Sequence, residues 1–156
     1  MYGGDYRNLK PVTIEEVEEW YEWHSSDPLR WMIEAEGRCI GNARLTILDE
    51  ENRRARYAIG LFDTTTWNRG YGTEATRLVL RYAFEKLHLH RVDLVVLEYN
   101  HRAIAFYKKC GFVQEGVARE TTLVAGHWHN DVIMSILEDE YRALVPGWNL
   151  PPAEDN

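Results

Sequence analysis

Two short segments of the chain carry residue types at spacings that could hold a ligand and act on it. The first is Trp67–Thr73 (WNRGYGT), in which two glycines would let the backbone turn tightly and approach a ligand closely. If a helix begins there, its free N–H groups and the positive end of its dipole favour an anion such as pyrophosphate. Arg69 would place a guanidinium beside the same anion.

This glycine segment is a weak signal when it is taken alone. It matches neither the dinucleotide-binding pattern GxGxxG nor the P-loop, because no Gly-Lys-Ser/Thr follows the glycines. The alternative interpretation is a plain turn between a strand and a helix.

The second segment is Asn100–Phe112 (NHRAIAFYKKCGF). Asn100 and Tyr107 are seven residues apart, about two helical turns, so they lie on roughly one face of a helix. A tyrosine hydroxyl at that place could give its proton to a leaving thiolate. The alternative for Tyr107 is a place in the core, which is the commoner role of a helical tyrosine.

Other potentially reactive residues receive a structural interpretation. Cys110 stands beside a helix-ending glycine in an apolar run, so we expect it in the core. His127 and His129 would share one strand face, but no clear third ligand accompanies them. The sequence therefore predicts no metal site.

The elements that would position these segments follow from the spacing of the apolar residues. Thr13 and Glu16 match a capping box, which predicts the start of a first helix. Three strands joined by short turns should then form an antiparallel meander: Arg30–Glu34, Cys39–Leu48 and Ala55–Phe62.

After the meander, helices and strands alternate. A helix over Thr73–Leu87 follows the glycine segment, because its apolar residues share one face. Arg91–Glu98 is largely apolar on both faces, which is typical of a central strand. A short helix over Asn100–Cys110 and a closing hairpin of Phe112–Leu123 and His127–Leu137 complete the chain. The predicted fold class is α/β (α+β), a mixed sheet with one β-α-β crossover.

The length and composition of the chain limit the domain count, the cellular location and the binding partners that we expect. The 156 residues fit one domain, which we place at residues 1–144, with an extended proline-rich tail at 145–156. The net charge of −7 argues against nucleic acid and leans weakly toward a cationic substrate. No apolar run suits a membrane span or a secretory signal, and the two cysteines lack metal spacing, so we expect a cytoplasmic protein.

Taken together, the two segments resemble the signature segments of the GNAT superfamily of N-acetyltransferases. The shared pattern is Arg69-Gly-Tyr-Gly followed by Asn100-x-Arg-Ala-Ile-x-Phe-Tyr-x-x-x-Gly-Phe, in order and at the right spacing. The resemblance runs from about Trp31 to about Tyr141. The most similar branch holds ribosomal-protein alanine/serine N-acetyltransferases and spermidine acetyltransferases.

The resemblance implies acetyl-CoA as the cosubstrate and direct transfer of its acetyl group to an amine. Backbone groups of Ile59 and Leu61 would pair with the pantetheine arm, Asn100 would hydrogen-bond it, and Tyr107 would act as the general acid near the sulfur. Backbone N–H groups of five consecutive residues would hold the pyrophosphate: Arg69, Gly70, Tyr71, Gly72 and Thr73. The acceptor stays open among a protein N-terminus, a polyamine, an aminoglycoside and another small amine, and we expect a homodimer.

The chain departs from the family pattern in two places. Many members place a glutamate where this chain has Arg56 and Tyr57, so the general base is left among Glu98, Glu115 and Asp131. The family's N-terminal strand and helices line the acceptor site, and we expect them to be missing or shortened here. Either the first 12 residues replace them, or the acceptor site is open or completed by a partner chain. Two alternatives therefore stay open: a catalytically degenerate CoA-binding module or sensor, and an enzyme that uses a different acyl donor on the same fold.

Overall fold

The computed structural model describes residues 27–152. The helix predicted from Thr13 and the expected shortening of the N-terminal part lie outside these residues. None of the helices in the described part is long and apolar enough to cross a membrane.

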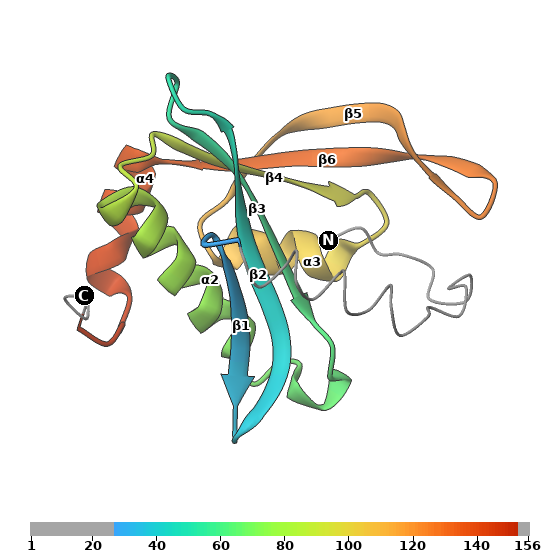
Figure 1. The fold of residues 1–156 in the computed structure, drawn as a ribbon. Coiled ribbons are helices and arrows are strands. Elements are labelled where there is room, and N and C mark those ends of the chain that lie inside the picture. Colours follow the sequence, from blue (N-terminus) through green and yellow to red (C-terminus); the bar gives the residue numbers. More distant parts are fainter. Residues whose placement is uncertain (1–26, 153–156) are drawn as a thin grey trace.

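A six-stranded mixed sheet forms the centre of the molecule (Figure 1). Its spatial order is β1-β2-β3-β4-β6-β5, and every neighbouring pair is antiparallel except β3 with β4. The meander, the parallel pair at the crossover and the closing hairpin confirm the predicted fold class. The strands span Arg30–Ala35 (β1), Arg38–Asp49 (β2), Arg54–Leu61 (β3), Arg91–Leu97 (β4), Val113–Val124 (β5) and His127–Leu137 (β6).

Helices pack on one face of this sheet and bury the core there. The main helix, α2 (Tyr71–Arg81), continues as a π-helical turn, η3 (Tyr82–Lys86), and α3 (His101–Lys109) follows β4. The core combines Tyr57, Val92 and Leu94 of the strands with Leu80 of α2 and Tyr107 of α3. The elements predicted around the two signature segments are thus present, with α2 beginning two residues earlier than expected.

β3 and β4 pair over only three residues and then separate. The parallel register joins Arg54–Arg56 to Arg91–Asp93, and no pairing follows it. β2 pairs with β3 up to Leu61, and β6 pairs with β4 up to Leu97, so each half of the sheet continues intact beyond this point. Figure 1 shows the two strands diverging beyond this pairing, and we call the unpaired stretch between residues 57–61 of β3 and 94–97 of β4 the wedge.

The chain beyond β6 holds a short helix that the sequence reasoning missed. α4 (Glu138–Leu144) begins where the Glu140 carboxylate accepts a hydrogen bond from the Leu137 N–H at 2.8 Å. The tail, expected to be extended, contains a 3-10 turn, η4 (Val145–Gly147), and places the buried ring of Trp148 5.5 Å from that of Tyr141. These aromatic contacts tie the described part of the tail to the helical layer. The domain boundary at residue 144 stays a prediction.

Candidate active site

The glycine segment forms the turn from β3 into α2, after a short 3-10 turn, η2 (Thr64–Thr66). Gly70 is the residue before the helix and has φ 91°, a left-handed conformation that glycine adopts without strain. Gly72 is buried, and a Cβ there would lie 3.4 Å from side-chain atoms of both Leu61 and Phe106. The end of β3, the start of α2 and the α3 helix therefore meet at this turn.

The N-terminus of α2 has no side-chain cap. The first N–H groups of any α-helix lack partners within the helix, and usually a neighbouring side chain accepts from one of them. In α3, by contrast, the Asn100 side chain accepts from the Ala103 N–H at 3.2 Å. The backbone donors at Tyr71, Gly72 and Thr73 are thus left for a ligand, and the helix dipole makes an anion the favoured one.

The Arg69 side chain, predicted to lie beside the anion, contacts a carboxylate of the protein instead. Its guanidinium pairs with the Glu36 carboxylate, in the turn between β1 and β2, at 2.5 Å. The Tyr71 hydroxyl donates to the same carboxylate at 3.1 Å, and the guanidinium lies 5.2 Å from the Tyr71 ring centroid. Hydrogen bonds from Arg69 and Tyr71 lower the pKa of Glu36. This contact fastens the glycine turn to the first hairpin, so the groups of the turn that could bind an anion are its backbone N–H groups.

Ile59 and Leu61 present their backbone groups to the wedge. The Phe62 N–H donates to the Ile40 carbonyl on β2 at 2.8 Å, so the peptide groups of Phe62 and Gly60 face β2. Successive residues of a strand direct these groups to opposite edges. The N–H and C=O groups of Ile59 and Leu61 therefore point to the side where β4 has moved away.

Tyr107 lies on α3, behind the wedge, and is 2% exposed. Its ring contacts Phe106 and Phe112, with centroids 5.1 and 5.7 Å away, and its hydroxyl has no hydrogen-bond partner among residues 27–152. Burial first, and then the Cys110 thiol, raise its pKa above the ordinary value. Tyr107 is therefore protonated at neutral pH, and it occupies the core position that was its alternative interpretation. Its catalytic role stays a prediction.

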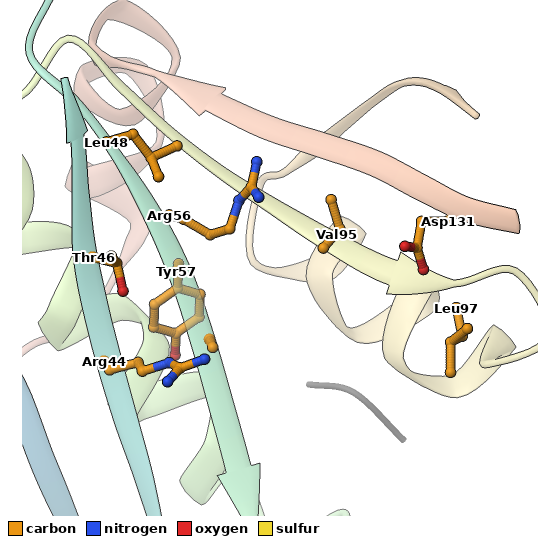
Figure 2. A pocket seen from close by; sticks show the side chains of 9 residues that line it. Arg44, Thr46, Leu48, Arg56, Tyr57, Val95, Leu97 and Asp131 are labelled. Atoms are coloured by element: carbon orange, nitrogen blue, oxygen red, sulfur yellow. The ribbon is translucent and has the colours of Figure 1, made fainter. Parts of the chain in front are cut away.

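A cavity of about 270 Å³ opens on the sheet face opposite α2, between the two halves of the sheet. Figure 2 shows Arg44, Thr46 and Leu48 of β2 and Arg56 of β3 on one side of this space. Val95 and Leu97 of β4 and Asp131 of β6 lie on the other side (Figure 2), and Tyr57 and Ala58 complete the lining. A thioester threaded through the wedge from the α2 face would reach this cavity.

The three candidate bases lie in different places. Glu115 accepts two hydrogen bonds from Arg91, both at 2.6 Å, which lower its pKa to about 2, and it does not line the cavity. Glu98 accepts from the backbone and side chain of Asn130, and these bonds lower its pKa. Asp131, which is 7% exposed, is the carboxylate of the cavity lining in the described part of the chain.

Several residues of the site were not found by sequence reasoning. Arg44 belongs to an unremarkable strand, and Glu36 to a hairpin turn, so neither carries a motif. Arg102, inside the second segment, places its guanidinium 3.5 Å from the ring centroid of Trp67, which precedes the glycine turn. These residues meet only through the pairing of distant strands and helices.

Cys110 behaves as a structural residue. Cys110 is fully buried, and burial raises its pKa to about 11, which agrees with the predicted core position. Within residues 27–152 no group of three side chains suited to hold a metal ion is found.

Comparison with known proteins gives consistent matches over most of the chain. The family model of the acetyltransferase (GNAT) domain matches residues 2–113. The spermidine N(1)-acetyltransferase of Escherichia coli K12 is 30% identical over 139 residues, which cover 86% of this chain and 74% of that protein. The putative ribosomal N-acetyltransferase YdaF of Bacillus subtilis is 35% identical over 107 residues, 68% of this chain and 57% of that one.

A solved structure has the same fold. It is the spermidine N-acetyltransferase from Vibrio cholerae in complex with CoA and spermine, and it superposes with a TM-score of 0.74 at 28% sequence identity. The match covers 85% of this chain and 79% of that one.

Proposed function

Because this chain belongs to the GNAT acetyltransferase family, we propose that it moves the acetyl group of acetyl-CoA directly onto a primary amine. The observation that carries the proposal is the wedge between β3 and β4, with an uncapped helix N-terminus at its entrance and a cavity at its far side. As a GNAT enzyme the protein uses acetyl-CoA, which supplies an activated acetyl thioester.

The described residues fit this cosubstrate. The backbone amides from Arg69 to Thr73 would hold the pyrophosphate at the start of α2. The free edge of β3 at Ile59 and Leu61 would pair with the amide groups of the pantetheine arm, and the Asn100 side-chain amide, whose oxygen caps α3, has its N–H groups left to donate. A β3 N–H would also stabilise the negative charge that develops on the thioester oxygen.

Two proton movements complete the transfer. A C–N bond forms, the C–S bond breaks, and the proton that the amine loses is matched by one that the sulfur gains. We propose Tyr107 as the donor to the sulfur, since burial keeps its hydroxyl protonated. Asp131 is the candidate base whose side chain lines the cavity, and a water between it and the amine would carry the proton.

The acceptor is tested with a panel of amines. Relatives include spermidine acetyltransferases and a putative ribosomal N-acetyltransferase, so spermidine and N-terminal peptides are the first compounds to assay. We expect acetyl-CoA-dependent release of free thiol with at least one amine class, and loss of this release in Asp131→Asn. Tight binding of acetyl-CoA without turnover on any amine would instead support the degenerate CoA-binding module.

We further propose a cytoplasmic homodimer. The edge strand β5 exposes the apolar side chains of Val117 and Leu123, and Trp128 on β6 is 59% exposed beside them. A second copy could cover these side chains. Light scattering after size exclusion would show a particle of twice the chain mass.

A further inference from the structure

The two sides of the cavity carry opposite charges. Arg44 and Arg56 project from β2 and β3, whereas Asp131 projects from β6 across the wedge (Figure 2). The other lining side chains from residues 27–152 are uncharged. A ligand in this cavity therefore meets cations on one side and an anion on the other.

Arg44 has no hydrogen-bond or ion-pair partner among residues 27–152. The residue directly opposite it across the β1–β2 pair is Arg30, which is itself ion-paired with Asp27 at 3.8 Å. Like charges directly opposite each other destabilise a strand pair. Desolvation first, and then the charge of Arg44, lower the pKa of Arg30. A bound anion would offset this repulsion and give the Arg44 guanidinium a partner.

Arg56 is only partly satisfied by the protein. Its Nε donates to the buried Asp93 carboxylate at 2.8 Å, which fixes the direction of the guanidinium. Its terminal nitrogens have no acceptor within residues 27–152, and 44% of the side chain is exposed. Asp93 thus holds Arg56 in place while leaving donors for a ligand.

Asp131 is held in a fixed position on the opposite side. One of its oxygens, Oδ2, accepts hydrogen bonds from the hydroxyls of Thr121 and Thr122, each at 2.9 Å. The other oxygen has no hydrogen-bond donor among the described residues. An oriented carboxylate with one free oxygen is suited to an ammonium group.

We propose that the acceptor is an amine that also carries a carboxylate, such as an amino acid. Its amine would lie toward Asp131 and the wedge, and its carboxylate would lie toward Arg44 and Arg56. Guanidinium groups match carboxylates in shape and charge, whereas a polyamine would place further ammonium groups against the two arginines. This inference rests on the proposed acetyl transfer and names the substrate class for it. The local charge of the cavity thus opposes the weak lean toward cationic substrates that the net charge of −7 suggested.

The test compares matched substrates in the thiol-release assay. Each α- and ω-amino acid is assayed against its own carboxamide, which keeps the amine and removes the negative charge, and against putrescine and spermidine. We expect kcat/KM for the best amino acid to exceed that of its carboxamide by roughly tenfold to a hundredfold, the range of a charge-assisted hydrogen bond.

Variants of Arg44 test whether this side chain causes the preference for an amine with a carboxylate. Arg44→Gln should remove most of the preference for the carboxylate over the carboxamide and leave acetyl-CoA affinity unchanged. Arg44→Lys should retain part of the preference, because the positive charge remains. Arg119→Gln, an exposed position on β5 outside the cavity, removes the same charge and should change nothing.

The outcomes separate this inference from the proposed function. Turnover of spermidine in preference to every amino acid, with no effect of Arg44→Gln on the ranking, would overturn the inference and leave the acetyl transfer standing. Absence of thiol release with every amine would overturn the proposed function. The inference is then judged by calorimetry of an N-acetyl amino acid with the CoA-bound protein: binding that Arg44→Gln abolishes would support it, and absence of binding would refute it.

Discussion

The hydroxyl of Tyr107 lies among aromatic rings without a hydrogen-bond partner in the described part of the chain, and this burial raises its pKa. A proton donor must hold its proton until the leaving group needs it, and burial serves this purpose. A buried position is expected for a core residue and also for a proton donor, so the place of Tyr107 in the structure fits both interpretations.

Removing that hydroxyl should affect turnover and leave the fold alone. Tyr107→Phe loses no hydrogen bond within the described residues, so we expect an unchanged midpoint of thermal unfolding and unchanged acetyl-CoA affinity. Turnover should fall by roughly a hundredfold to ten-thousandfold, the usual contribution of a general acid. Steady-state thiol release and calorimetry on the same preparation measure these effects.

Tyr141→Phe is the matched control. The Tyr141 hydroxyl donates to Glu85 at 2.6 Å, away from the wedge, so its loss should lower the free energy of unfolding by roughly 1–3 kcal/mol and spare turnover. Unchanged turnover in Tyr107→Phe would remove Tyr107 from the mechanism.

Glu115 contributes to stability in a pH-dependent way. Its pKa is about 2 in the folded protein, because Arg91 and then Ser135 donate hydrogen bonds to the carboxylate, so it lies below the ordinary value of 4.5. The unfolded chain therefore binds the proton more readily between these values, and the contribution is present above pH 4.5 and lost as pH falls toward 2.

Chemical denaturation over this pH range should show that effect. Wild type should exceed Glu115→Gln in stability at neutral pH, and the difference should vanish toward pH 2. Glu51→Gln, in the exposed β2–β3 turn, should match wild type throughout. A difference that stays constant with pH would contradict the assignment.

At the scale of the elements, the site depends on how α2 begins. The sequence predicted this turn correctly, because glycine spacing and a following amphipathic pattern are local signals. It placed the helix start two residues late, since the glycine at 72 is unusual inside a helix but is favoured here by close contact with Leu61 and Phe106. α4 was missed because only a few apolar residues mark its seven positions, and its stability comes from the contacts of Tyr141 with distant elements.

A side chain at Gly70 should weaken binding of acetyl-CoA. Its φ of 91° is costly for other residues, although nothing lies within 4 Å of an added Cβ. We expect Gly70→Ala to lower the free energy of unfolding by about 1 kcal/mol and to weaken acetyl-CoA binding by roughly tenfold as the turn relaxes. Calorimetric titration and thermal unfolding give both values.

The Gly126→Ala variant is the control that separates the loss of acetyl-CoA affinity from the loss of stability. Gly126 has φ 82° and equally open surroundings, but it lies in the β5–β6 turn, away from the glycine segment. The Gly126→Ala variant should lose a similar amount of unfolding free energy and should bind acetyl-CoA as tightly as wild type. Equal affinities for the two variants would show that the turn at Gly70 does not hold the pyrophosphate.

At the scale of the whole molecule, the sheet divides between β3 and β4, with the glycine turn before α2 on one face and the cavity on the other. The order of elements and the crossover were predictable, since they follow from periodicity along the chain. The charge pattern of the cavity was not, because Arg44, Arg56 and Asp131 come from three strands whose register no local signal reveals. Sequence reasoning therefore named candidate groups for the cosubstrate, which stay predictions, and named Asp131 as a candidate base, but it did not find Arg44 or Arg56.

Titration of acetyl-CoA into the protein by isothermal calorimetry tests the central claim most directly. The account predicts one site per chain with a dissociation constant in the micromolar range, roughly −8 kcal/mol, and much weaker binding of acetyl pantetheine, which lacks the pyrophosphate. Absence of acetyl-CoA binding to the folded protein would mean that the turn at Gly70 and the wedge beside it do not form a cosubstrate site, and the proposed acetyl transfer would be contradicted.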